Sequence, residues 1–219
     1  ELHKLIEPMA KQPPKGVVIH SGKSNGFVMG ADINEFTRIE NPEQAYDLIR
    51  LGQQVLDQLE ALPCPTVAAI NGFALGGGLE LAMACDYRVA LETDKRILGL
   101  PEVQLGIHPG GGHTWMLRRI VGPQAAMATV VFGQVLDGKE AERIGLVNTV
   151  YDTHEAGLDG VRAIAREIAT KSPLAVASSK EIMHYARDHS VDDALELGRL
   201  LGIEVRRVEI GPIYDAYRD

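Results

Sequence analysis

Two glutamates stand in apolar, glycine-rich stretches of the chain. Glu80 is flanked by Leu79 and Leu81, and Glu102 follows Pro101 in a second apolar run. Taken singly, each has an ordinary explanation: Glu80 as an acid favoured near a helix start, and Glu102 as a turn residue after proline. Burying an ionised carboxylate costs free energy, however, and two acids in different surroundings are a standard route to separate acid and base roles. The pair is therefore a candidate for general acid–base chemistry.

Glycine-rich backbone lies where a predicted strand ends and a predicted helix begins. Residues 71–80 read NGFALGGGLE, and an earlier segment, residues 26–33, reads GFVMGADI. The glycines at 76–78 allow conformations that a Cβ forbids, and a helix start presents N–H groups without partners in the helix. Such a turn suits an oxygen that becomes anionic during a reaction. It is neither a P-loop nor a GxGxxG fingerprint, so a tight packing turn is an equal alternative.

Three other polar residues have weaker claims to chemistry. His108 and His113 are five positions apart, but no third ligand type stands nearby in the sequence. We therefore predict turn and surface histidines rather than metal ligands. Asp32 follows directly after a glycine turn, where an Asx-type hydrogen bond to the backbone is expected instead of a catalytic role.

The elements expected to carry these residues alternate between strands and helices. Residues 16–20 (GVVIH) and 66–70 (TVAAI) are short, β-branched runs bounded by Pro or Gly, which predicts buried strands. Residues 45–62 have apolar side chains at helical spacing and end before Pro63, and a third strand is expected at residues 87–91. A helix over residues 79–85 is expected between the last two strands. This order favours an α/β fold.

The second half of the chain is predicted to be mainly helical. The expected helices cover residues 124–132, 139–144, 154–170, 173–187 and 191–208, with a short strand at 146–150. Ser172 and Ser190 are predicted N-caps. We expect a core over residues 1–152 and a helical lid or assembly region over residues 153–219, acting as one functional unit. Residues 1–12 have the pattern of a helix already under way, so a preceding segment is expected to be missing.

The size and charge of the chain argue against a multidomain protein and against binding to nucleic acid or anionic membranes. The 219 residues suit one domain, and the net charge of −8 repels nucleic acid and anionic membranes. No apolar run approaches the length of a membrane span. Cys64 and Cys85 have neither metal nor disulfide spacing, so buried reduced thiols and a cytoplasmic location are expected.

Three motifs together resemble the crotonase superfamily of enoyl-CoA hydratases and isomerases. They are GFVMGADI at residues 26–33, PTVAAINGFALGGGLELAMACDYRVA at 65–90, and LPEVQLGIHPGGG at 100–112. The resemblance implies an α/β crotonase (ClpP-like) spiral of ββα repeats with a C-terminal helical region. It also implies homotrimers, commonly paired into hexamers, and a CoA thioester as substrate.

The resemblance also assigns roles to residues. It places the backbone N–H donors for the thioester oxygen on Ala31 and Gly77, and the two catalytic acids on Glu80 and Glu102. The implied substrate and CoA contacts are Ala31, Asp32, Ile33, Asn34, Gly76 and Gly77. The implied reaction is syn-addition of water to a trans-2-enoyl-CoA, with Glu80 as base, Glu102 as acid, and no metal or separate cofactor.

Two alternatives stay open, and one motif departs from the family. An enoyl-CoA isomerase would use the same fold, and a non-catalytic binding protein is disfavoured by the intact acid pair. A dienoyl-CoA isomerase would need a further acid where Gly110 stands. The family usually has Gly-Gly before Thr-Gln-Arg, whereas this chain has His-Thr-Trp-Met at residues 113–116. Trp115 there either narrows the acyl pocket or packs at a subunit contact, and packing is the favoured interpretation.

Overall fold

The computed structural model describes residues 2–23, 26–32, 38–93 and 95–188. The chain divides into two compact units, residues 1–177 and residues 178–219. The predicted helix at 191–208, the Ser190 cap, and two expected substrate contacts, Ile33 and Asn34, lie outside the described residues. The division after residue 152 and the lid role of the tail stay predictions.

The first sheet is built from parallel strands in the order β1-β3-β5-β8. Its strands are β1 (Val17–His20), β3 (Thr66–Ile70), β5 (Tyr87–Leu91) and β8 (Thr149–Tyr151). All five residues of β3 are buried, because this strand lies between two others and is covered on both faces. The three strands predicted in the first half of the chain are thereby confirmed.

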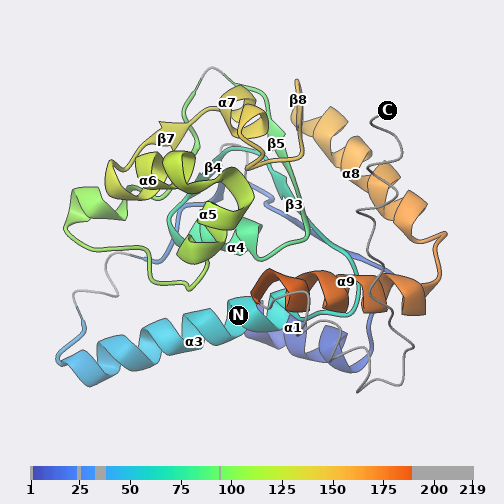
Figure 1. The fold of residues 1–219 in the computed structure, drawn as a ribbon, viewed down its shortest axis with the longest axis horizontal. Helices are drawn as coiled ribbons and strands as arrows, with labels where there is room; N and C mark the ends of the chain where they lie inside the picture. Colours follow the sequence, from blue (N-terminus) through green and yellow to red (C-terminus); the bar gives the residue numbers. More distant parts are fainter. Residues whose placement is uncertain (1, 24–25, 33–37, 94, 189–219) are drawn as a thin grey trace, which may run out of the picture. The chain divides into compact units, whose positions relative to one another are not determined.

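A second sheet follows the order β2-β4-β6-β7, with only β6 and β7 antiparallel. It contains β2 (Gly26–Val28), β4 (Phe73–Leu75), β6 (Leu98–Gly99) and β7 (Val135–Leu136). The pairs β1–β2, β3–β4 and β5–β6 each give one strand to each sheet before the chain turns into a helix (Figure 1). This repetition is the predicted spiral of ββα units.

Helices follow these strand pairs and make up most of the rest of the described chain. They are α1 (Leu2–Lys11), α3 (Pro42–Glu60), α4 (Gly77–Met83), the 3-10 helix η1 (Pro101–Leu105), α5 (Thr114–Val121), α6 (Pro123–Val131), α7 (Gly138–Arg143), α8 (His154–Ile168) and α9 (Pro173–Asp188). Side-chain caps fix several starts: Asn41, Asp137 and Thr153 each accept a hydrogen bond from the backbone N–H three residues later. The Asn41 cap explains why α3 begins three residues before the predicted start.

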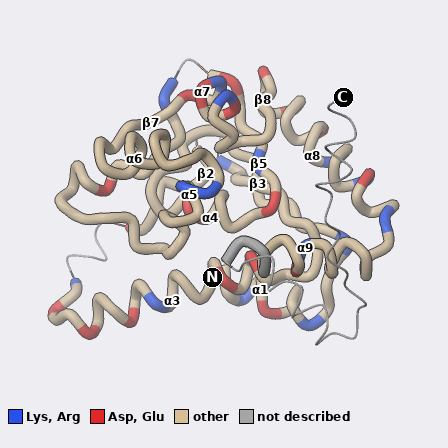
Figure 2. The backbone as a smooth tube through the Cα atoms, viewed as in Figure 1, with Lys and Arg blue, Asp and Glu red and all other residues tan. Residues whose placement is uncertain are grey.

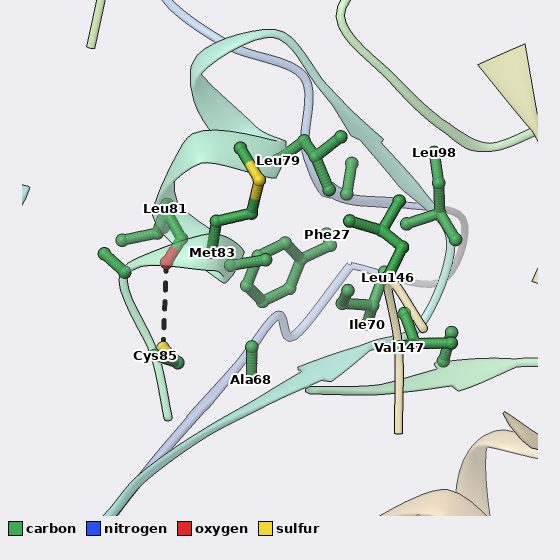
Figure 3. Packing of buried hydrophobic residues seen from close by; sticks show 14 of the residues in the cluster. Phe27, Ala68, Ile70, Leu79, Leu81, Met83, Cys85, Leu98, Leu146 and Val147 are labelled. Carbon is green, nitrogen blue, oxygen red and sulfur yellow. Dashed lines mark hydrogen bonds between the residues drawn. The ribbon is translucent and has the colours of Figure 1, made fainter. Parts of the chain in front are cut away.

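One hydrophobic core joins α4 to both sheets. Figure 3 shows the Phe27 side chain of β2 between side chains of α4 and β3. The buried residues around it include Ala68, Ile70, Leu79, Met83, Leu98, Leu146 and Val147. Leu79 and Met83 are four residues apart, so one side of α4 is anchored here. Burying such a side chain stabilises a fold by about 1.5–3 kcal/mol, which makes α4 a firm base for the residues it carries.

The charge distribution and the hydropathy of the described residues show no basic surface stripe and no membrane-spanning helix. Lys and Arg are scattered among Asp and Glu over the described part of the chain rather than gathered in one basic stripe (Figure 2). Among the helices that the structure describes, none is both long and apolar enough to cross a membrane.

Candidate active site

Glu80 is held in the first turn of α4 by groups from a distant turn. Its side chain is only 1% exposed. One carboxylate oxygen, Oε2, accepts a hydrogen bond from the N–H of Gly111 at 2.8 Å. The other, Oε1, accepts from the N–H of His113 at 3.2 Å and from the hydroxyl of Thr114 at 3.3 Å. Both oxygens therefore act as acceptors, which offsets the cost of burying a carboxylate.

The turn that holds Glu80 requires glycine. A Cβ on Gly111 would overlap Glu80 Oε2, and Gly112 has φ +90°, a conformation that side chains disfavour. The turn leads directly into α5, which lies beside α4 (Figure 1). Gly111 is thus explained by the approach of the backbone to a buried carboxylate, and Gly112 by its positive φ.

Glu102 lies over the glycine turn that opens α4. It is the second residue of η1, which begins at Pro101, and its Oε1 is 2.6 Å from where a Cβ on Gly76 would stand. Gly76 has φ +55°, so both its conformation and the space above it favour glycine. Among the described residues, the buried Oε2 of Glu102 has no hydrogen-bond partner. Glu102 is therefore much less satisfied than Glu80.

This difference changes the proton affinity of Glu102. Burial raises the pKa of the Glu102 carboxyl above its ordinary value, and the nearby charge of Glu80 raises the pKa further. A hydrogen bond with its own backbone, second only to burial in size, lowers the pKa, and the nearby His108 has the smallest lowering effect. The fold thus brings the two predicted acids near each other: one accepts three hydrogen bonds, and the other has a raised pKa.

The predicted backbone donors are also brought together. The helix α4 packs so closely on β2 that a Cβ on Gly78 would overlap the carbonyl oxygen of Val28. A Cβ on Gly30, which has φ +91°, would be 3.5 Å from the nitrogen of Gly77. Ala31, the next residue, is exposed beside this junction. The two segments named from sequence therefore meet at the start of α4, next to Glu102.

The histidine prediction is half wrong. His108 is exposed, but His113 is 2% exposed and points its ring into the protein instead of to the surface. No group of three His, Cys, Asp or Glu side chains suited to a metal ion occurs in the described part of the chain. Trp115 is 45% exposed, with the Arg119 guanidinium 4.5 Å from its ring centre. Asp32 is also exposed.

Sequence reasoning missed the partners of Glu80. Gly111, His113 and Thr114 are 31 to 34 positions away along the chain, and only the packing of α5 on α4 brings them near. One signal was available: the glycine run at residues 110–112 is similar to the run at 76–78, where unpaired backbone N–H groups were expected.

Comparison with known proteins assigns the family. Residues 1–201 match the family model described as enoyl-CoA hydratase/isomerase. The chain belongs to the enoyl-CoA hydratase/isomerase family. It is thus an enzyme of the crotonase kind, as the three sequence motifs implied, and its two-sheet spiral agrees with solved members.

Relatives of this family differ in how much of their length the chain matches. A Bacillus subtilis protein named "Probable enoyl-CoA hydratase" is 41% identical over 183 residues, which are 84% of this chain and 70% of that protein. The "Fatty acid oxidation complex subunit alpha" of Shewanella frigidimarina is 49% identical over 146 residues, 67% of this chain but only 21% of that protein. The crystal structure of enoyl-CoA hydratase from Bacillus anthracis superposes with TM-score 0.84 at 32% identity, covering 91% of this chain and 76% of that one.

Proposed function

We propose that this enzyme adds water across the double bond of a 2-enoyl-CoA thioester to give the 3-hydroxyacyl-CoA. One observation carries the proposal: two glutamates in opposite environments lie within electrostatic reach of each other, Glu80 against the turn at Gly111 and Glu102 over the turn at Gly76. Hydration needs both a group that takes a proton from water and a group that gives a proton to carbon. The family name alone does not separate hydration from isomerisation.

The thioester oxygen is proposed to lie at the junction of Gly30 and Gly77, and the close approach of these residues supports the assignment. There, the N–H groups of Ala31 and Gly77 would donate to the oxygen. As water adds at C3, negative charge moves onto this oxygen, and fixed donors stabilise the enolate-like state more than the substrate. Loss of one such donor typically lowers the rate about 10²–10³-fold.

The proton transfers follow from the two carboxyl environments. Glu80 accepts every hydrogen bond that holds it, which suits a base that takes one proton from water as the oxygen bonds to C3. Glu102 has a raised pKa and a buried oxygen without a partner among the described residues, which suits an acid that delivers its proton to C2. Water thus supplies OH to C3, and the proton that Glu80 gains restores Glu102 on turnover.

Several further properties belong to the same proposal. Adding water changes no net oxidation state, so no redox cofactor is required, and we propose that CoA enters only as part of the substrate. A homotrimer or a pair of trimers is the proposed assembly. The similarity to a fatty acid oxidation complex subunit supports acyl-CoA catabolism as the pathway class.

The test follows the absorbance of the conjugated thioester. Purified enzyme is mixed with crotonyl-CoA and with a longer 2-enoyl-CoA, alongside the Glu102→Gln variant and a matched Glu155→Gln control, since Glu155 is an exposed acid on α8. We expect rapid loss of absorbance with wild type and control, and a rate about 10²–10⁴-fold lower with Glu102→Gln.

The same assay separates the isomerase alternative. A wild-type enzyme that leaves both 2-enoyl thioesters untouched, yet gains absorbance from a 3-enoyl-CoA, would replace hydration by isomerisation. Equal rates for wild type and Glu102→Gln would remove the acid role from Glu102 while leaving the family assignment intact.

A further inference from the structure

His113 and Glu60 form a buried polar contact behind the proposed catalytic base. Their side chains are 3% and 13% exposed, and His113 Nε2 lies 3.8 Å from Glu60 Oε2. This distance exceeds a hydrogen bond, so the interaction is electrostatic. No partner within hydrogen-bond distance of Nε2 exists among the described residues.

The position of Glu60 is electrostatically unfavourable by itself. It is the last residue of α3, and no basic residue stands in the last turn of that helix. A helix C-terminus carries partial negative charge, so a poorly solvated carboxylate there is disfavoured. The imidazole of His113 lies beside this carboxylate, with 3.8 Å from Nε2 to Oε2, and adds to the other interactions that Glu60 makes.

Both ring nitrogens of His113 face acceptors. Nδ1 lies 3.5 Å from the carbonyl oxygen of Gly111, and Nε2 faces Glu60. The ring thus lies between the end of α3 and the turn whose N–H groups hold Glu80.

The same face of α3 makes further contacts with this turn. Gln53 Nε2 donates to the carbonyl oxygen of Gly110 at 2.8 Å. A Cβ on Gly110 would lie 3.7 Å from the Ile49 side chain. Ile49, Gln53 and Glu60 are spaced by four and seven positions, so they lie along one side of the helix. This side of α3, the long pale-blue helix in Figure 1, supports the turn along its length.

We infer that His113 and Glu60 are a positioning pair for Glu80. By fixing the ring, Glu60 sets the direction of the main-chain N–H groups of His113 and Gly111, and these set the orientation of the Glu80 carboxylate. Neither residue touches the reacting atoms. The expected effect of these residues on the reaction rate rests on the proposed function. Their expected effect on the Gly111 N–H does not depend on which reaction the enzyme catalyses.

The kinetic test is a double-mutant cycle with Glu60→Ala, His113→Ala and both together. Because misdirected catalytic groups lower rate more than binding, we expect each single change to lower kcat about 10- to 10²-fold with little change in KM. The double variant should be no slower than the slower single, because the two residues act through one contact. Glu60→Gln and His113→Gln, which keep an acceptor and a donor, should recover part of kcat.

Asp57→Ala is the matched control. Asp57 is an exposed acid in the same last part of α3, so its removal takes away a similar charge without touching His113, and kcat should stay at the wild-type value. Thermal unfolding of every variant checks that the fold is kept. Unchanged kcat in the two single variants, or effects that multiply in the double variant, would overturn the inference.

A structural measurement separates this inference from the proposed function. The amide proton of Gly111, which donates to Glu80, is followed by ¹H–¹⁵N NMR in wild type, Glu60→Ala and Asp57→Ala. Its resonance should move in Glu60→Ala and stay in place in Asp57→Ala. A wild type without hydratase activity would contradict only the proposed function, while a Gly111 resonance that Glu60→Ala leaves unmoved would contradict the positioning pair.

Discussion

The two carboxylates of the site are supported by regions of very different construction. Glu80 lies on a helix anchored in the core and accepts three hydrogen bonds from the turn before α5. Glu102 lies on a short 3-10 helix, and one of its buried oxygens has no hydrogen-bond partner among the described residues. Two residues of one type thereby acquire opposite tendencies: one is fixed as an acceptor, and the other has a raised pKa. We propose that the supporting backbone, more than the residue type, decides the two roles.

The largest expected effect comes from Glu80→Gln. The amide cannot take a proton from water, and its NH₂ group would face N–H donors in a site arranged for a carboxylate. Hydration of crotonyl-CoA should fall about 10²–10⁴-fold, measured by thioester absorbance. An unchanged hydration rate would contradict the base role of Glu80, because its carboxylate would then serve only the structure.

The next largest effect on kcat is expected from replacing the glycine that contacts each carboxylate. A Cβ at Gly111 would displace Glu80, and a Cβ at Gly76 would displace Glu102 while also straining a positive φ. Gly111→Ala and Gly76→Ala should each lower kcat about 10²-fold, because shifts of about 1 Å in catalytic groups cost that much. Gly52→Ala is the control: it lies on α3 with open space around the added Cβ, so kcat should not change. Wild-type activity in Gly76→Ala would show that Glu102 need not lie over this turn.

Stability should separate the two acids more clearly than activity does. Glu80→Gln leaves at least one buried N–H of the turn without an acceptor, so the free energy of unfolding should fall by about 1–3 kcal/mol. Glu102→Gln removes a poorly satisfied buried carboxylate and should leave the free energy of unfolding equal or higher. Urea unfolding of both variants measures this. Equal loss of stability in the two variants would contradict the claim that Glu80 is better hydrogen-bonded than Glu102.

The smallest effect is the pH dependence of stability that Glu102 contributes. Its pKa in the folded protein lies above the ordinary value of 4.5, so in this range the folded state binds more protons than the unfolded state. Its contribution to stability is therefore fully present below pH 4.5 and is lost as pH rises through the raised pKa. The advantage of Glu102→Gln over wild type should grow with pH over that window, measured by urea unfolding at several pH values. An advantage that shrinks with rising pH would contradict the raised pKa.

Local sequence signals predicted the strands of the first sheet well. The run TVAAI at residues 66–70 is bounded by proline and asparagine and forms a strand with those bounds, because all its side chains enter the core. The strands β2, β4 and β6 have only two or three residues, too few to show a pattern of alternation. They could be placed only through the resemblance to a family of ββα repeats.

The sequence predicted those parts of the site whose residues are close together along the chain. Glu80 and Gly77 stand in one run, so their proximity was implied by the sequence itself. The N–H of Gly111 reaches Glu80 from 31 positions away, which no local pattern indicates. His113 was expected in a turn or at the surface because no third metal-ligand type stands nearby in the sequence, yet it is buried where α3 contacts that turn. Long-range packing therefore decides which polar groups support the acids.

The division of roles between the acids can be tested most directly with a substrate that has no double bond. Butyryl-CoA in D₂O exchanges a C2 hydrogen only if a group beside C2 removes and returns a proton, and this needs no water at C3. We predict that wild type and Glu80→Gln incorporate deuterium at C2, as seen by mass spectrometry, whereas Glu102→Gln does not. Exchange that persists in Glu102→Gln and disappears in Glu80→Gln would show that the roles are reversed.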